Sequence, residues 1–406
     1  MRRRTIVPLV LGTLLATSDL AAQGAAVAPI AWTRHAIQST TLKMEREYLV
    51  ALPPGYESSD AHYPVLVLLD AGDEPQFVAA LANIWFLASR NEIPELIVVG
   101  ILNGADRTHD LTPPTRDPEE QSMFPTAGGV RAFATYVTTE VLPAVRAGHR
   151  TIPATFLAGH SFGGLFALEV ATALPDAFRG AVSMSPALQW SQGEYAVKYA
   201  DALAQRTDGY RLFVTSGGLE PPIDSSTQRM MARLDSLDSS SRIAIAYQRY
   251  PDATHGMTPL PSLVDGLRFV FEPISLRELT GGLAAIPPSA DSATILTLVT
   301  DAEKRYAEGA RALGLTEQVP EAFYNEQGYG ALQWFNNPAA AVALFRRNVE
   351  LYPASANVYD SLGDGLLALG DRAGARAQFE KAVALAEESG HPVLQESRRK
   401  LELFKQ

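Results

Sequence analysis

Between residues 46 and 271 the sequence alternates between short apolar runs bounded by turn residues and longer segments whose apolar residues have helical spacing. Continuous apolar runs such as Val65–Leu69 and Leu96–Leu102 are typical of strands that are covered on both faces. The alternation predicts strands joined by helical crossovers, and hence an α/β fold around a mostly parallel sheet. The predicted strands lie within residues 46–56, 65–69, 96–102, 154–159, 180–185, 211–216 and 242–250, and the predicted helices within 74–90, 128–145, 227–237, 260–271 and the segment after Gly164.

Length and composition limit the classes of protein to consider. A chain of 406 residues is long enough for two or three domains. The net charge is -11 and no run rich in Lys and Arg occurs beyond the N-terminus, which argues against a nucleic-acid partner because phosphate binding needs a basic surface. The chain has no cysteine, so disulfides, thiolate metal sites and cysteine nucleophiles are excluded.

The first 22 residues have the order of features found in a secretory signal peptide. A basic stretch, Arg2–Arg4, is followed by the apolar run Ile6–Ala16 and by small residues at Ala21 and Ala22 that suit a signal peptidase. The apolar run is too short to cross a bilayer, and no other segment predicts a membrane span. We therefore expect residues 1–22 to be cleaved and the protein to be secreted or periplasmic; the alternative is a buried N-terminal helix.

The composition shifts at residues 279–291, which are rich in Gly, Pro and Ala and predict a linker. Residues 292–406 beyond it have helical spacing and no strand pattern. At an offset of 34, this region aligns Leu332 with Leu366, Ala341 with Ala375, Phe345 with Phe379, Val349 with Val383 and Leu351 with Leu385. That period resembles the tetratricopeptide repeat, whose helical hairpins bury their apolar faces by stacking. The resemblance implies a module that docks a peptide or protein partner or associates with itself; an unrelated helical bundle is the alternative.

The segment Ala154–Val170, "ATFLAGHSFGGLFALEV", joins a predicted strand to a predicted helix through the pattern G-x-S-x-G. In that context the pattern predicts a sharp turn that holds Ser161 as a nucleophile. Side chains at the flanking positions would collide with the neighbouring strand and helix, so Gly159 and Gly163 fit the turn. The alternative is a glycine-rich connection with an incidental serine.

A serine hydroxyl needs a base, and the expected order along the chain is serine, acid, histidine. Of the seven histidines, only His255 follows both Ser161 and the last strands while preceding the helical region. The acid should follow the penultimate strand, where the sequence offers Glu220 and Asp224; we favour Glu220 because it comes directly after the Gly-Gly turn. Asp252 is interpreted as a turn residue, and a Ser-His pair with no acid stays open.

An oxyanion hole needs two hydrogen-bond donors. One is the backbone N–H of Phe162, the residue after the nucleophile. The other should come from the loop after the first long buried strand, "LLDAGDE", where we choose Gly72 over Ala71. The alternative for this loop is a simple turn from strand to helix.

Several stretches within residues 30–275 resemble the Putative esterase family, which includes enterochelin-esterase-like and esterase-D-like α/β-hydrolases. They are "YPVLVLLDAGD", "NGADRTHDLTP", "EVLPAV" followed by "HRT", "LAGHSFGG", "MSPALQW" and "DATHGM". The resemblance implies an α/β-hydrolase catalytic domain over residues 30–278. It also implies that Arg107 and Asp110 shape the loop beside the pocket and that Arg107 and Trp190 contact substrate; the alternatives are an ion pair within the loop and a plain core tryptophan.

The sequence thus predicts an exported serine esterase that needs no metal or cofactor and acts on a small ester, siderophore-like or other. Two alternatives stay open. In the first, the helical region carries the function by docking a partner, and the hydrolase domain is a scaffold. In the second, the reaction is acyl transfer or peptide-bond cleavage rather than ester hydrolysis.

Overall fold

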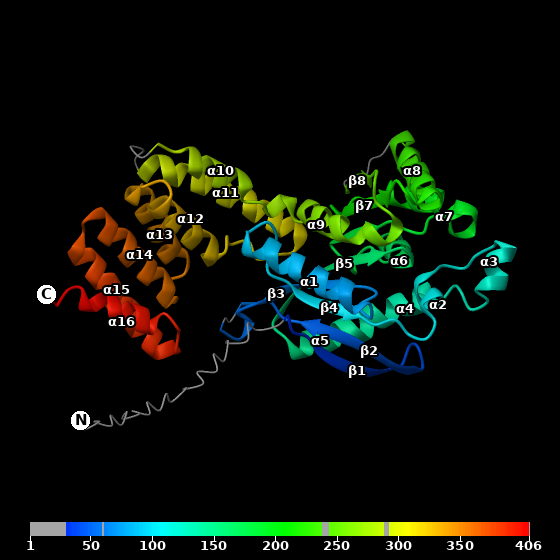
Figure 1. Ribbon diagram of the computed structural model, residues 1–406, viewed down its shortest axis with the longest axis horizontal. Helices are drawn as coiled ribbons and strands as arrows, with labels where there is room; N and C mark the ends of the chain where they lie inside the picture. The colour runs from blue at the N-terminus through cyan, green and yellow to red at the C-terminus, as the bar shows by residue number, and fades with distance from the viewer. Residues whose placement is uncertain (1–29, 59–60, 238–242, 288–291, 406) are drawn as a thin grey trace, which may run out of the picture.

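The structure is a computed structural model that describes residues 30–58, 61–237, 243–287 and 292–405. The predicted signal peptide, residues 1–22, lies outside the described residues. An α/β part built on one sheet occupies one end of the molecule, and a set of helices that begins with α10 occupies the other end (Figure 1). No helix in the described ranges is long and apolar enough to cross a membrane.

The sheet has eight strands in the order β1-β2-β4-β3-β5-β6-β7-β8. The strands β4, β3, β5, β6, β7 and β8 are parallel to one another, whereas β1 and β2 pair antiparallel at one edge. The prediction of a mostly parallel sheet is therefore confirmed. The strands are β1 (Thr33–Ser39), β2 (Met44–Ala51), β3 (Tyr63–Leu68), β4 (Ile97–Ile101), β5 (Thr151–His160), β6 (Gly180–Met184), β7 (Arg211–Gly217) and β8 (Ala244–Tyr250).

Strand β1 was not predicted. Its sequence, TRHAIQS, is mostly polar, and most of its side chains are exposed because it lies at the edge of the sheet. An edge strand that buries little lacks the apolar run on which the other strands were recognised.

Helices cover both faces of the sheet, as the unbroken apolar runs require. In β3, Leu66 and Leu68 join the core that contains α1 and α9, whereas Val65 and Val67 point to the opposite core. That second core holds α4, α5, α6 and α7. The helices of this part are η1 (Tyr56–Ser58), α1 (Glu74–Ser89), α2 (Arg107–Leu111), α3 (Pro118–Met123), α4 (Val130–Tyr136), η2 (Val137–Val141), α5 (Leu142–Gly148), α6 (Phe162–Ala173), η3 (Trp190–Gly193), α7 (Glu194–Leu203), α8 (Pro221–Ser236), η4 (His255–Met257), α9 (Pro259–Val270) and η5 (Glu272–Ile274).

The remaining helices are α10 (Arg277–Ala285), α11 (Ser292–Leu313), α12 (Glu321–Gln333), α13 (Pro338–Leu351), α14 (Ala356–Leu369), α15 (Arg372–Ser389) and α16 (Leu394–Glu402). The segment expected to be a linker, residues 279–291, is thus largely helix α10. Leu279 is only 4% exposed and belongs to the apolar cluster that also contains residues of α11 and α12. Packing of this face outweighs the low helix propensity of Gly281 and Gly282, on which the linker prediction relied.

The helical region does not stand apart from the α/β part. Phe271 and Ile274 lie in one continuous apolar cluster with Val299 and Tyr306 of α11. Gly309 of α11 lies so close to the turn η5 that an added Cβ would be 2.5 Å from the carbonyl carbon of Pro273. The two parts therefore share a core rather than being joined by a free tether.

Helices α12 and α13 form one antiparallel pair and α14 and α15 form the next, and each pair packs closely. Phe345 and Phe379, which align at the offset of 34, are both fully buried. Each ring packs against a glycine of the preceding helix, Gly328 and Gly363 respectively. The helical nature of the C-terminal region is as predicted.

Candidate active site

Ser161 lies at the sharp turn between β5 and α6, at the carboxyl end of a central strand. Its backbone has φ 61° and ψ −118°, a left-handed conformation that is rare for residues with a side chain. A Cβ on Gly159 would lie 2.5 Å from the carbonyl carbon of Gly163, and one on Gly164 would lie 2.9 Å from the carbonyl oxygen of Met184. The steric reason for glycine is therefore confirmed at Gly159, whereas a Cβ on Gly163 would make a tight contact with the Asp70 side chain, 3.1 Å from Oδ2.

The turn is held by main-chain hydrogen bonds on both sides. The N–H of Ser161 donates to the carbonyl of Met184 at 3.0 Å, and the N–H of Ala187 donates to the carbonyl of Ser161 at 3.1 Å. The first bond within α6 runs from Leu165 N–H to the same Ser161 carbonyl. The amide of Phe162 therefore lies in the first turn of the helix, where N–H groups have no acceptor within the helix and favour negative charge.

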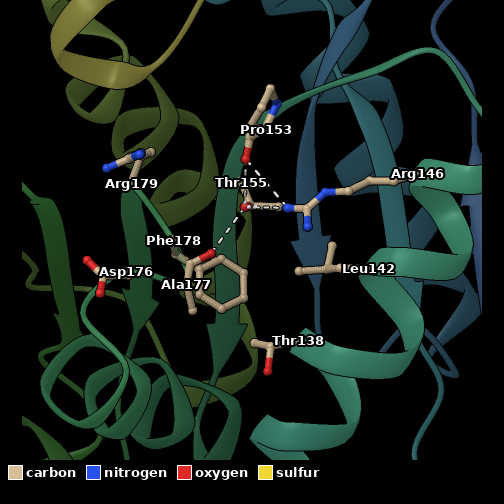
Figure 2. Close-up of a pocket in the computed structure, with 9 residues that line it drawn as sticks. All are labelled: Thr138, Leu142, Arg146, Pro153, Thr155, Asp176, Ala177, Phe178 and Arg179. Atoms are coloured by element: carbon tan, nitrogen blue, oxygen red, sulfur yellow. Dashed lines mark hydrogen bonds between the residues drawn. The ribbon is translucent and has the colours of Figure 1, made fainter.

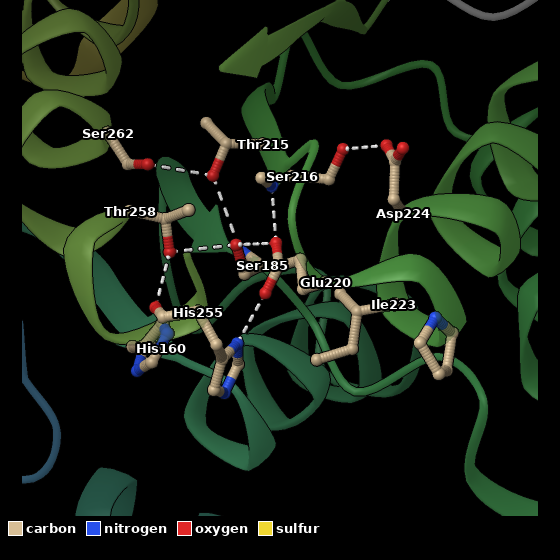
Figure 3. Close-up of polar contacts among 12 residues, drawn as sticks. His160, Ser185, Thr215, Ser216, Glu220, Ile223, Asp224, His255, Thr258 and Ser262 are labelled. Atoms are coloured by element: carbon tan, nitrogen blue, oxygen red, sulfur yellow. Dashed lines mark hydrogen bonds and ion pairs between the residues drawn. The ribbon is translucent and has the colours of Figure 1, made fainter. Parts of the chain in front are cut away.

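His255 and Glu220 meet although 35 residues separate them. His255 begins the turn η4 after β8, and Glu220 follows β7; the two loops lie side by side because Gly218 N–H donates to the carbonyl of Tyr250 at 2.8 Å. The Nδ1 atom of His255 lies 2.5 Å from Oε2 of Glu220 (Figure 3). This contact leaves Nε2 of His255 free for a proton transfer, and it fixes the tautomer when Glu220 accepts the Nδ1 proton.

Glu220 is almost completely buried, yet it is well supplied with donors. Its Oε1 atom accepts the hydroxyl of Ser185 at 2.6 Å and the N–H of Gly217. Burial raises the pKa of Glu220, but the hydrogen bonds from His255, Ser185 and Gly217 together hold it below its ordinary value. The group is therefore a carboxylate at neutral pH.

His255 contacts the serine turn through His160, the residue before Ser161. The rings of His160 and His255 stack with their centroids 4.3 Å apart and their planes 36° apart. Burial, assisted by the neighbouring His255, lowers the pKa of His160 to about 4. The Nε2 atom of His160 is buried and meets no hydrogen-bond partner among the described residues, as suits a neutral imidazole.

Asp224, the alternative acid, is engaged elsewhere. Its carboxylate accepts the hydroxyl of Ser216 at 2.6 Å and forms an ion pair with Arg249 at 2.9 Å. The structure therefore brings Glu220, and not Asp224, to His255.

Arg107 also contacts the serine turn. Its guanidinium donates to both carboxylate oxygens of Asp70, at 2.6 and 2.8 Å, and to the carbonyl of His160 at 3.3 Å. Asn103 also donates to Asp70, at 2.7 Å. Arg107 does not pair with Asp110, which instead bonds to the buried Arg46, so the ion pair considered within this loop is wrong.

Sequence reasoning missed Asp70, which follows β3 and has φ 60°. Asp70 lies beside α6: a Cβ added to Gly163 would be 3.1 Å from the Oδ2 atom of Asp70. The only signal in the sequence was its position at the end of a buried strand. A carboxylate there holds the guanidinium of Arg107 beside the serine turn.

Trp190 lies in the core rather than on an open surface. It is 3% exposed, and its indole N–H donates to the carbonyl of Pro113 at 2.9 Å. Its ring contacts Phe162 and Phe124, with centroids 5.4 and 5.8 Å away. The tryptophan therefore packs against Phe162, the residue that follows Ser161.

The loop after β3 turns toward β4. The N–H of Ala71 donates to the carbonyl of Ile101 at 3.1 Å, so Ala71 has no free amide to offer. A Cβ on Gly72 would meet only Leu102, at 3.8 Å. Leu102 follows β4, which pairs with β3 on the side away from β5.

The pocket of Figure 2 lies at the opposite end of β5 from Ser161. Its volume is about 130 Å³, and its arginine Arg146 already donates to Pro153 and Thr155 at 3.5 Å. It is therefore unrelated to the serine site. In the described parts of the chain, no three His, Asp or Glu side chains are grouped so that they could hold a metal ion.

Known proteins resemble this chain in both sequence and fold. The ferri-bacillibactin esterase BesA of Bacillus subtilis (strain 168) is 27% identical over 244 residues, which cover 54% of this chain and 83% of BesA. The crystal structure of an IroE-like serine hydrolase from Shewanella oneidensis has a TM-score of 0.61 and 23% identity, and the match covers 79% of this chain and 100% of that one. An uncharacterised protein from Capnocytophaga ochracea has a TM-score of 0.58 at 16% identity over 90% of this chain and 99% of its own.

The family model described as Putative esterase matches residues 39–258, more than half of the chain. That range contains the serine turn, Glu220 and His255. The chain belongs to the Putative esterase family, and it is an ester hydrolase.

Proposed function

We propose that the protein hydrolyses carboxylic esters through an acyl-serine intermediate, with Ser161 as nucleophile, His255 as base and Glu220 as the orienting acid. The observation that carries the proposal is the pair formed by His255 and Glu220, with the ring of His255 against the residue that precedes Ser161. The left-handed backbone of Ser161 supports it further, because such strain persists where the surrounding structure maintains it for function.

In this mechanism His255 takes the hydroxyl proton of Ser161 at Nε2 while the serine oxygen bonds to the ester carbonyl carbon. The imidazolium is stabilised by Glu220 at Nδ1. The same proton then passes to the departing alcohol as the bond from carbon to the alkoxy oxygen breaks. A water activated by His255 finally attacks the acyl-serine, which releases the acid and returns the proton to Ser161.

The negative oxygen of each tetrahedral intermediate needs donors. The amide of Phe162 at the start of α6 is proposed as one of them, where the helix end also favours negative charge. Gly72 stays our proposal for the second donor, because the amide of Ala71 is already used by Ile101.

For the substrate, we propose small esters, with siderophore-like esters as the first class to try. The name of the relative BesA supports this choice. The side chains that flank Glu220 and His255 are apolar and exposed, namely Leu219 at 60% and Met257 at 56%. They favour esters whose alcohol or acyl part presents an aromatic or aliphatic surface. Arg107 offers a cation on the opposite side of the turn.

The experiment is fluorophosphonate labelling of the purified full chain, followed by a panel of p-nitrophenyl and aryl lactone esters. We expect the label on Ser161 and loss of turnover in S161A. Full turnover in S161A, or labelling of a different residue, would contradict the mechanism. Added alcohol acceptors in the same assay distinguish acyl transfer from hydrolysis.

We also propose that residues 1–22 are cleaved on export, that residues 30–278 form the catalytic domain, and that residues 292–406 form a tetratricopeptide-like region that docks a peptide or protein partner or a second copy. The offset of 34 between buried Phe345 and Phe379 supports the repeat assignment. Mass spectrometry of the mature N-terminus tests the first proposal. If the protein keeps full activity and solubility after deletion of residues 286–406, the helical region does not support the catalytic domain, and a role in docking a partner is favoured.

A further inference from the structure

A group of buried hydroxyls behind Glu220 has no part in the mechanism described so far. Ser185, Thr215, Thr258 and Ser262 are each fully buried, and Figure 3 shows them on the side of Glu220 away from Asp224. Hydroxyls without access to water need hydrogen-bond partners, so their arrangement is informative.

Three contacts link two of these hydroxyls to the catalytic pair. The Ser185 hydroxyl lies 2.6 Å from Oε1 of Glu220 and 2.8 Å from the hydroxyl of Thr258. The Thr258 hydroxyl in turn lies 2.9 Å from the carbonyl oxygen of His255. Two hydroxyls carry only two protons, so one of the three contacts has no hydroxyl proton to itself.

The charge of Glu220 decides how the protons are distributed. An ionised carboxylate only accepts hydrogen bonds, so the contact with Ser185 requires the proton of Ser185. Thr258 donates its own proton to the carbonyl of His255, so the contact between Ser185 and Thr258 can only share the proton of Ser185.

Donation by Ser185 to Thr258 alone would fail. The oxygen of Ser185 would then face Oε1 of Glu220 with no proton between them unless Glu220 were neutral. Glu220 accepts two further donors, His255 and Gly217, which favour its ionised form.

We propose that Ser185 is a positioning residue for the reaction: it gives its single proton to Oε1 of Glu220, is itself held by Thr258, and so keeps Oε2 aimed at Nδ1 of His255. The backbone of Ser185 supports a specific role, since its φ of 41° is in the left-handed region that side chains rarely occupy. Its N–H is anchored to the hydroxyl of Thr215 at 3.2 Å. The inference rests on the proposed role of Glu220.

The test is a double-mutant cycle in the full chain with p-nitrophenyl acetate as substrate. Hydrogen bonds to charged groups are stronger than neutral ones, so we expect S185A to lower kcat about tenfold or more while KM changes less than about twofold. In the E220Q background the same change should cost less than about threefold, because its carboxylate target is gone. T258V should lower kcat by a smaller factor in the same direction.

The matched control is S226A, which removes another buried serine hydroxyl, one that donates to Pro222 within α8. It should leave kcat unchanged, and thermal melting will show whether each variant is folded. Equal losses for S185A in both backgrounds, or a loss confined to KM, would overturn the inference about Ser185. If E220Q itself leaves kcat unchanged, the proposed role of Glu220 fails, and that of Ser185 fails with it.

Discussion

The close approach of α11 to the turn η5 makes a prediction that a pair of Gly→Ala variants can test. Gly309 and Gly330 both lie inside helices, but their surroundings differ. A Cβ on Gly309 would be 2.5 Å from the carbonyl carbon and 2.9 Å from the Cβ of Pro273, whereas a Cβ on Gly330 would meet only Trp334, at 4.0 Å. The two substitutions have the same chemistry and therefore the same intrinsic effect on helix formation.

In an exposed helix, Ala is more favourable than Gly by about 1 kcal/mol, and G330A should gain up to this amount. G309A would gain the same amount but must displace α11 from a backbone atom, which costs about 1–3 kcal/mol in a packed core. The two variants should therefore differ in unfolding free energy by about 1–3 kcal/mol, with G309A the less stable.

Calorimetry of the purified proteins measures this difference. At roughly 2 °C per kcal/mol for a chain of this size, G309A should melt about 2–6 °C below G330A. The kcat of G309A on p-nitrophenyl acetate at 25 °C should equal that of the parent, because α11 lies away from Ser161. Equal melting temperatures for the two variants would refute the packing of α11 against Pro273 and, with it, the shared core.

Three other outcomes are expected. Because the pKa of Glu220 is lowered in the folded protein, its contribution to stability is complete above the unfolded pKa of about 4.3 and is lost as the pH falls through the folded pKa. In urea titrations at a series of acidic pH values, the free energy of unfolding of E220Q should therefore fall less steeply with decreasing pH than that of the parent. D70N keeps a residue type that tolerates a left-handed backbone but removes the charge that holds Arg107. The KM for anionic esters should therefore change several-fold. An unaltered KM for these esters would argue against a substrate contact by Arg107. W190F leaves the Pro113 carbonyl without its buried donor and should cost about 1–3 kcal/mol of stability at an unchanged KM, whereas a raised KM would mean that the ring contacts substrate.

The serine turn and its partners could be predicted because their signals are local or few. The strand, the glycines and the helix around Ser161 follow one another directly, and His255 was the one histidine of seven in the expected position. The order of the strands offered Glu220 and Asp224, and the position directly after the Gly-Gly turn favoured Glu220. The α/β pattern was equally readable, since buried parallel strands have unbroken apolar runs.

What could not be predicted depends on contacts between distant segments. Arg107 faces Asp70, 37 residues earlier, rather than its neighbour Asp110. Trp190 finds the carbonyl of Pro113, 77 residues earlier, and so becomes a core residue. Helix α10 forms across Gly281 because it packs against α11 and α12, and no local sequence pattern indicates those contacts.

His160 connects the two sides of the serine turn, since its carbonyl accepts Arg107 and its ring lies on His255. The loop that carries Arg107 and the loop that carries His255 therefore both contact this one residue. A library that aims to broaden the range of esters accepted would have to vary both loops together, because a change in one loop would move His160 and so alter the packing of the other. Gains selected separately should not add when they are recombined.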